Sequence, residues 1–88
     1  MNKDEFLATI ADGGYAEIVA VTRAADAIFD THSHPFDAQA LVLHGEMKIR
    51  IADTEHLYRA GDVFQVPARC EHSERFGPQG VTYLAARK

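Results

Sequence analysis

The sequence predicts an all-β domain, namely a small antiparallel β-barrel that follows one short N-terminal helix. After Gly14 the apolar residues recur with a period of two or in short runs, which is typical of strands. Turn residues separate these runs at short intervals. The alternating helices that a parallel sheet requires are missing, which favours a sandwich or barrel.

The chain length limits the protein to a single domain. Its 88 residues are 47% hydrophobic, and a chain this short buries only about 60 to 65% of its unfolded surface. Residues 1–14 are expected to form a helical segment and residues 15–88 the β-barrel domain. Small barrels often gain stability by joining a second copy, which favours self-association on general grounds without proving it.

The helix is expected at the very start of the chain. Either Asn2 or Asp4 would cap it, and Gly13 with Gly14 would end it. Its apolar stripe consists of Phe6, Leu7 and Ile10.

Eight strands are expected after the helix. They cover residues 17–22, 27–34, 38–43, 47–51, 57–59, 63–66, 72–76 and 81–86. Four turns would separate several of them, at residues 44–45, 52–54, 60–62 and 77–80.

The expected hairpin at His44 and Gly45 assigns side chains to the two faces of the barrel wall. In its second strand, apolar residues alternate with Lys48 and Arg50, which defines the buried face. Pairing across the turn, with Leu43 opposite Glu46, would direct Ala38, Ala40 and Val42 to the interior. Asp37 and Gln39 would point outward, with Gln39 across from Arg50. A turn one residue longer would invert this register.

Charge and hydropathy exclude two classes of partner. The formal net charge is -4 and the basic residues are interspersed with acidic ones, so we expect no nucleic-acid binding. The longest apolar run, residues 38–43, is too short to span a bilayer, and the N-terminus lacks a secretory signal pattern. We therefore expect a cytoplasmic protein without membrane contact.

Histidine is the residue type most available for metal binding. The single cysteine, Cys70, excludes an internal disulfide and a four-sulfur zinc site. Five histidines remain, and His32 and His34 are two residues apart. Side chains at this spacing project from the same face of a strand, so both imidazoles can approach one ion. Two solvated histidines at a strand end are the alternative.

Two segments of the chain resemble the motifs of the cupin family. His32, His34 and Gly45 resemble the first motif, in which a His-x-His pair precedes an acid and then a turn glycine. Gly61 and His72 are the ends of "GDVFQVPARCEH", which is similar to the second motif, a glycine followed by a proline and a histidine. The resemblance covers residues 27–76. It implies a cupin-type, jelly-roll-like β-barrel that is usually dimeric.

The resemblance also implies a metal site. His32, His34 and His72 would converge in the barrel as ligands of a divalent transition metal, which could be Fe, Mn, Ni, Zn or Cu. Ala38 stands where the family has an acidic fourth ligand, and Arg69 stands where the second motif usually has glycine. Cys70 and Glu74 share the strand parity of His72. Cys70 is expected to be a small buried hydrophobe or a distant ligand, and Glu74 a solvated carboxylate or a pocket acid.

Three functions follow from these observations. The first is a small metalloenzyme acting on a small polar organic molecule through the three-histidine centre. The second is a non-catalytic small-ligand binding or sensing barrel that uses the same pocket, which the loss of the acid at Ala38 favours. The third is an interaction module in which strand 17–22 pairs with a second subunit. His44 and His56 are expected to be exposed, and Asp37 to have a structural role.

Overall fold

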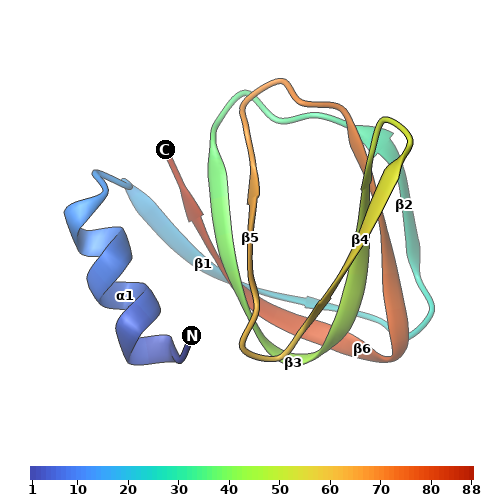
Figure 1. Cartoon of the computed structure of the whole chain (residues 1–88), viewed down its shortest axis with the longest axis horizontal. Coiled ribbons are helices and arrows are strands. Elements are labelled where there is room, and N and C mark those ends of the chain that lie inside the picture. Colours follow the sequence, from blue (N-terminus) through green and yellow to red (C-terminus); the bar gives the residue numbers. More distant parts are fainter.

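The computed structural model describes residues 1–88 as one helix followed by a six-stranded antiparallel sheet (Figure 1). Helix α1 has neither the length nor the apolarity that crossing a membrane requires. The elements are α1 (Lys3–Asp12), β1 (Glu17–Arg23), β2 (Ile28–His32), β3 (Ala38–Ile51), β4 (Thr54–Arg59), β5 (Val63–Val66) and β6 (His72–Arg87).

The ends of α1 are set by local side-chain chemistry. The Glu5 amide donates to Asn2 Oδ1 at 2.9 Å, and the Asn2 amide donates to Glu5 Oε1 at 3.1 Å. This reciprocal pair is a capping box, which satisfies two donors that a helix otherwise leaves free. Asn2, not Asp4, is therefore the N-cap, and Gly13 ends the helix as predicted.

Two long strands, β3 and β6, build the barrel (Figure 1). They pair with each other along most of their length. The first part of β3 also pairs with β5 and its second part with β4. Likewise the first part of β6 pairs with β2 and its second part with β1. The result is two four-stranded layers that share β3 and β6, an open, jelly-roll-like barrel whose sheet does not close.

The predicted hairpin at His44 and Gly45 is wrong, because β3 continues through both residues. Leu43 therefore does not pair with Glu46, and Gln39 lies opposite Gln65 and Ala86 instead of Arg50. The glycine marks a bend: its φ is +75°, the β3–β6 register shifts on both sides of it, and a side chain there would collide with the backbone of Gly80. Bulges bend a strand in this way without ending it.

The predicted turn at residues 77–80 is also wrong, since β6 runs through it. The eight expected strands are consequently six. The turns at residues 52–54 and 60–62 are confirmed, and so is the prediction that Ala38, Ala40 and Val42 face the interior: the latter two are buried and Ala38 lines the cavity described below.

The alternation along β3 and β6 divides the buried residues between two cores. The inner core fills the barrel between its layers. The outer core lies between α1, which Figure 1 shows outside the barrel, and the outer face of β3 and β6. It consists of Phe6, Ile10, Leu41, Leu84 and Ala86.

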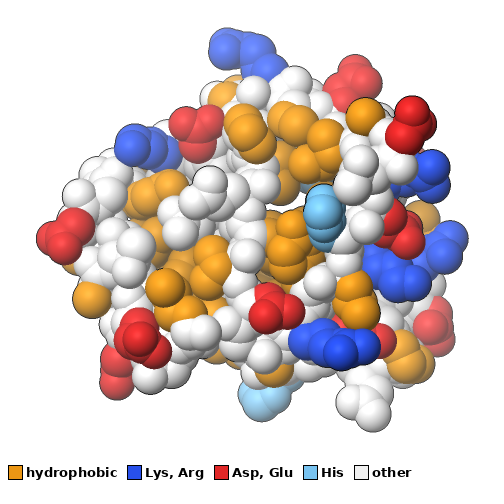
Figure 2. Space-filling view, viewed as in Figure 1, with side chains coloured by type: hydrophobic (Ala, Val, Ile, Leu, Met, Phe, Trp, Pro, Cys, Tyr) orange, Lys and Arg blue, Asp and Glu red, His pale blue; other side chains and the backbone are white.

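Charged side chains are distributed around the rim of the molecule. On the face in Figure 2, hydrophobic side chains gather in the middle, most charged side chains lie toward the edge, and several basic groups lie close together at the lower right with acidic groups among them.

Candidate metal centre

Three histidines from two distant parts of the chain meet inside the barrel. His32 ends β2, His34 follows it, and His72 begins β6 directly opposite His32 in the register. The ring centroids are 4.4 Å apart for His32 and His72, 5.0 Å for His34 and His72, and 5.1 Å for His32 and His34. One ring nitrogen from each lies within 4.8 Å of the other two, so the cluster could hold a metal ion.

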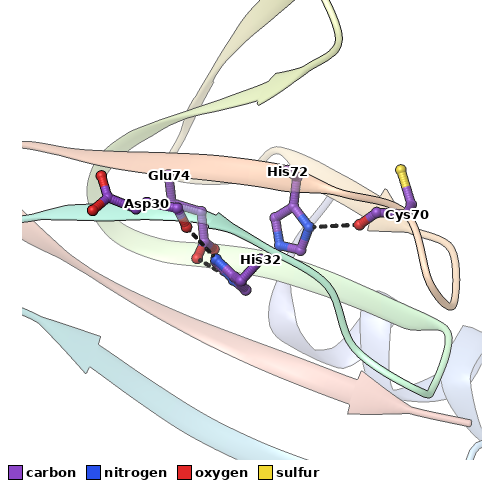
Figure 3. A network of polar contacts seen from close by, with 5 residues as sticks. All are labelled: Asp30, His32, Cys70, His72 and Glu74. Atoms are coloured by element: carbon purple, nitrogen blue, oxygen red, sulfur yellow. Dashed lines mark hydrogen bonds and ion pairs between the residues drawn. The ribbon is translucent and has the colours of Figure 1, made fainter.

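Backbone carbonyls orient two of the three imidazoles (Figure 3). His32 Nδ1 donates to the Asp30 carbonyl at 2.7 Å, and His72 Nδ1 donates to the Cys70 carbonyl at 3.0 Å. A carbonyl only accepts hydrogen bonds, so Nδ1 carries the proton in both rings. The Nε2 lone pairs are then free, which is the arrangement that metal-binding histidines commonly have.

His34 is held by packing instead of a hydrogen bond. Its ring stacks on Phe36 at 4.9 Å between centroids, and its buried Nδ1 has no hydrogen-bond partner. Burial lowers the pKa of His34, and the neighbouring imidazoles and the Arg87 guanidinium lower it further. The neutral ring that results is the form that can bind a cation.

A short network joins the segment that carries His34 to the loop that precedes His72. The Arg69 amide donates to the His34 carbonyl at 2.7 Å, and the Ala68 amide donates to Asp37 Oδ1, also at 2.7 Å. Asp37 thus has the structural role that the sequence predicts. Arg69 adopts a φ of +61°, the left-handed region that favours glycine, which explains why the second cupin motif usually has glycine here.

Glu74 brings a carboxylate to the histidine cluster. It lies two residues after His72 on β6, is only 8% exposed, and its Oε2 is 3.4 Å from His32 Nε2 (Figure 3). With its proton on Nδ1, a neutral His32 presents only a lone pair to this carboxylate. Two acceptors face each other stably only when a cation lies between them, either a second proton or a metal ion. The Glu74 carboxylate is therefore buried in the pocket and is not solvated.

The remaining candidates lie outside the cluster. The sulfur of Cys70 points away from His72 in Figure 3 and is 3.8 Å from the Glu71 carbonyl oxygen, while the half-buried side chain packs against the inner core. Ala38 lines the cavity but offers no ligand atom. His44 and His56 are exposed, as predicted.

The histidines line a cavity of about 100 Å³ in the barrel. Its walls also carry polar and aromatic side chains, among them Arg23, Phe29, Phe36, Glu74, Tyr83 and Arg87. The sequence reasoning did not single out the two arginines, although each has the inward parity of its strand. A larger hollow of about 410 Å³ lies beside Gly45 and Pro78, but it contains no histidine, and its two charged residues, Glu46 and Arg59, pair with each other.

The residues present fit a divalent transition metal. Imidazole is a preferred ligand of zinc, iron, copper and nickel. Two nitrogens that bind one ion at about 2.1 Å lie roughly 3.4 Å apart in a tetrahedral site. The nitrogens of the three histidines lie within 4.8 Å of one another, up to about 1.4 Å more than that spacing. The separation of 3.4 Å between Glu74 and His32 already equals the spacing of two ligands in such a site.

Comparison with solved structures identifies proteins of the same fold. The chain superimposes with a TM-score of 0.70 on an RmlC-like cupin from Shewanella frigidimarina, at 23% identity over 80% of this chain and 62% of that one. A variant of oxalate decarboxylase from Bacillus subtilis gives a TM-score of 0.74 at 21% identity, over 81% of this chain and 20% of that one. DMSP lyase DddQ from Ruegeria pomeroyi gives 0.74 at 19% identity, over 81% and 36%.

These likenesses concern the fold, and the chain spans less than two thirds of the length of each of the three proteins. No curated protein matches the chain in sequence. The family model of the cupin domain, Cupin_2, matches residues 19–77, well over half of the chain. The chain therefore belongs to the cupin domain family.

Proposed function

We propose that the protein binds one divalent transition metal through His32, His34 and His72 and uses this centre to bind or convert a small polar organic molecule. The observation that carries the proposal is the convergence of three imidazoles, two of them oriented by carbonyls so that Nε2 is free. The Mn(II) centres of Bacillus subtilis oxalate decarboxylase, which shares the fold, support a divalent ion.

The surrounding residues would divide the chemical tasks. A metal ion, when bound, supplies Lewis-acid activation of an oxygen atom on the ligand. Glu74 is placed to accept a proton from a ligand in the cavity, because its carboxylate is buried beside the imidazoles. Tyr83 can donate a hydrogen bond to such a ligand, because it lines the same cavity as a protonated phenol. Burial and the charge of Glu74 raise its pKa to about 12.

Metal analysis of histidine variants tests the centre. Purified protein is loaded with Zn²⁺ or Mn²⁺, desalted and measured for metal content by mass spectrometry. We expect about one ion per chain for the wild type and a loss of most of the metal in His34→Ala, because two imidazoles alone bind weakly. His56→Ala is the matched control, since His56 is exposed on β4. Full metal content in His34→Ala would contradict the proposal.

A second candidate is a binding or sensing barrel without turnover. Ala38 favours it, since no acidic ligand stands at that position of the first motif. The two functions separate in one experiment, in which small organic molecules are screened by thermal shift and the mixtures are then analysed for products. A stabilising molecule that is recovered unchanged supports the sensing barrel, and turnover of any molecule supports the enzyme.

We also propose that the protein forms a homodimer through the free edge of β1. This strand pairs with β6 on one side only, and Ile18 on its outer face is 45% exposed. A strand edge with an exposed apolar side chain favours pairing with a second copy. Light scattering should give a dimer mass for the wild type and a monomer mass for Ile18→Lys, whereas a dimeric Ile18→Lys would exclude this edge.

A further inference from the structure

The cavity beside the histidines contains two cationic side chains that lack carboxylate partners within it. Arg23 and Arg87 both line it, and Glu74 is the single carboxylate among the lining residues. Neither arginine forms an ion pair with Glu74. The cavity therefore holds an excess of positive charge even before any metal ion enters.

Arg23 is the more unusual of the two. Its Nε is buried and has no hydrogen-bond partner, and no acidic side chain lies within ion-pair distance of its guanidinium. Buried polar atoms in folded proteins are nearly always paired, so an unpaired one calls for a missing partner. The guanidinium lies over the Phe29 ring at 4.7 Å, which fixes its position without using its donors.

Arg87 has a similar arrangement on the other side of the cavity. Its guanidinium lies over the Phe36 ring at 4.9 Å, and its one ionic contact is with Glu17 at 3.9 Å, at a partly exposed position. Such a surface contact contributes little and leaves most of the guanidinium donors available. Arg87 lies opposite Glu17 and Arg23 opposite Val81 in the β1–β6 register, so the two arginines approach the cavity from opposite ends of this ladder.

Tyr83 adds a neutral donor between the arginines. It pairs with Val21 in the middle of the same ladder and lines the cavity. A tyrosine hydroxyl is protonated at neutral pH, and burial raises the pKa of Tyr83 further, to about 12. Arg23, Tyr83 and Arg87 thus line the same cavity, with the two arginines at its opposite ends, and a ligand that contacts either guanidinium must offer negatively charged acceptor oxygens.

The volume of the cavity limits the size of that ligand. The volume of about 100 Å³ is well below the several hundred cubic ångströms of sites for larger ligands. We infer that the cavity recognises a small aliphatic carboxylate of a few carbon atoms, bound by Arg23 beside the histidine cluster, with Arg87 as a second cation at the other end of the cavity. The inference deepens the proposed function, on which it rests for placing the carboxylate next to a metal ion.

Calorimetric titration tests the inference with matched probes. Metal-loaded protein is titrated with malonate and with malonamide, which has nearly the same shape but no charge. We expect malonate to bind at least about tenfold more tightly, because charge-assisted hydrogen bonds to guanidinium are the strong ones. Inorganic phosphate is titrated in parallel, and phosphate binding tighter than malonate would overturn the assignment to carboxylates.

Arginine variants separate recognition by the cavity from direct binding to the metal. Arg23→Gln should weaken malonate binding by roughly tenfold or more, and Arg87→Gln by less, while metal content stays unchanged in both variants. Arg59→Gln is the control, because this exposed arginine lies outside the cavity, and it should bind malonate within twofold of the wild type. Malonate binding that is insensitive to both cavity substitutions would overturn the inference.

Two further arms keep the test decisive. Arg23→Lys and Arg87→Lys retain the charge but lack the planar fork, so they should fold and still bind malonate a few times more weakly. The same titrations with metal-free protein distinguish the two proposals: if the wild type binds no metal, the proposed function fails, whereas arginine-dependent malonate binding would still support the carboxylate site. Loss of both the preference for malonate and the arginine dependence, with metal bound, overturns the carboxylate site alone.

Discussion

The two faces of the same strands in this protein serve different purposes. On the outer face of β6, Leu84 and Ala86 pack beneath α1 in a purely apolar core. On the inner face, Tyr83 and Arg87 of the same strand line the cavity with the histidines. One residue of displacement along the strand therefore separates a closed apolar contact from a polar site.

The two faces differ in what they contribute to the free energy of unfolding. Each buried polar atom without a partner costs about 1 to 3 kcal/mol, and both such side-chain atoms, Arg23 Nε and His34 Nδ1, belong to residues that line the cavity. The outer core has none. We infer that the helix-covered face offsets the cost of a cavity prepared for a ligand, and the predictions below test this division.

The largest expected effect is on the outer face. Phe6→Ala removes a fully buried ring between α1 and the sheet, so the free energy of unfolding should fall by about 3 to 5 kcal/mol in a urea titration. Leu7→Ala, which truncates a half-buried side chain of the same helix, should lose clearly less. Metal content should be unchanged in both folded variants. A selective loss of metal in Phe6→Ala would show that the two faces are coupled.

On the inner face, Tyr83 should make the free energy of unfolding depend on pH. The pKa of Tyr83 is raised from 10.0 to about 12 in the folded protein, so the unfolded chain loses this proton first as the pH rises. The contribution of the protonated phenol is complete below pH 10 and is lost as the pH rises from 10 to 12, a decrease of about 2 to 3 kcal/mol. Tyr83→Phe should flatten the pH dependence of unfolding in this range. An equal slope in both proteins would contradict the assignment.

The sequence predicts the local features of this comparison better than the long-range ones. The capping box of α1 and the alternation after Met47 are readable because they depend on neighbours a few residues apart. The roles of Gly45 and Gly80 cannot be read from the sequence in this way, since a glycine in a strand can mark a turn or a bulge. The pairing of β3 with β6, which are distant in sequence, decides between the two.

The site follows the same rule. His32 and His34 share a face because of their spacing, whereas the approach of His72 follows from the second cupin motif and from strand pairing. Arg23 and Arg87 were readable in principle, because each continues the inward parity of apolar residues before it on its strand. An arginine at the end of an apolar inward series is a signal that sequence reasoning can use, although it does not reveal that both reach one cavity.

A smaller loss of stability is expected when the hydrogen bond between Asp37 and the loop before His72 is removed. Asp37→Ala removes the acceptor of the Ala68 amide, which should lower the free energy of unfolding by about 1 kcal/mol. The loop should also hold His72 less firmly, so metal affinity measured by calorimetry should fall several-fold. Asp53→Ala, in the exposed β3–β4 turn, is the control and should change neither quantity. Unchanged metal affinity in Asp37→Ala would show that the loop does not position the ligand.

The smallest effect should be a gain. Arg69 holds a φ of +61°, which costs an ordinary residue about 1 to 2 kcal/mol, whereas glycine adopts it freely but loses about 0.5 to 1 kcal/mol through its more flexible unfolded state. Arg69→Gly should therefore stabilise the protein by about 0.5 kcal/mol, detectable as a small rise in Tm.

Asp26→Gly provides a comparison outside the cavity, with a φ of +58° and a smaller expected gain, because aspartate tolerates this region better than arginine. The Arg69 amide that donates to the His34 carbonyl is retained, so metal affinity should stay the same. A loss of stability in Arg69→Gly would mean that the arginine side chain stabilises the protein by more than the backbone strain costs. The unpaired polar atoms of the cavity would then be the one source of the lost stability on the inner face.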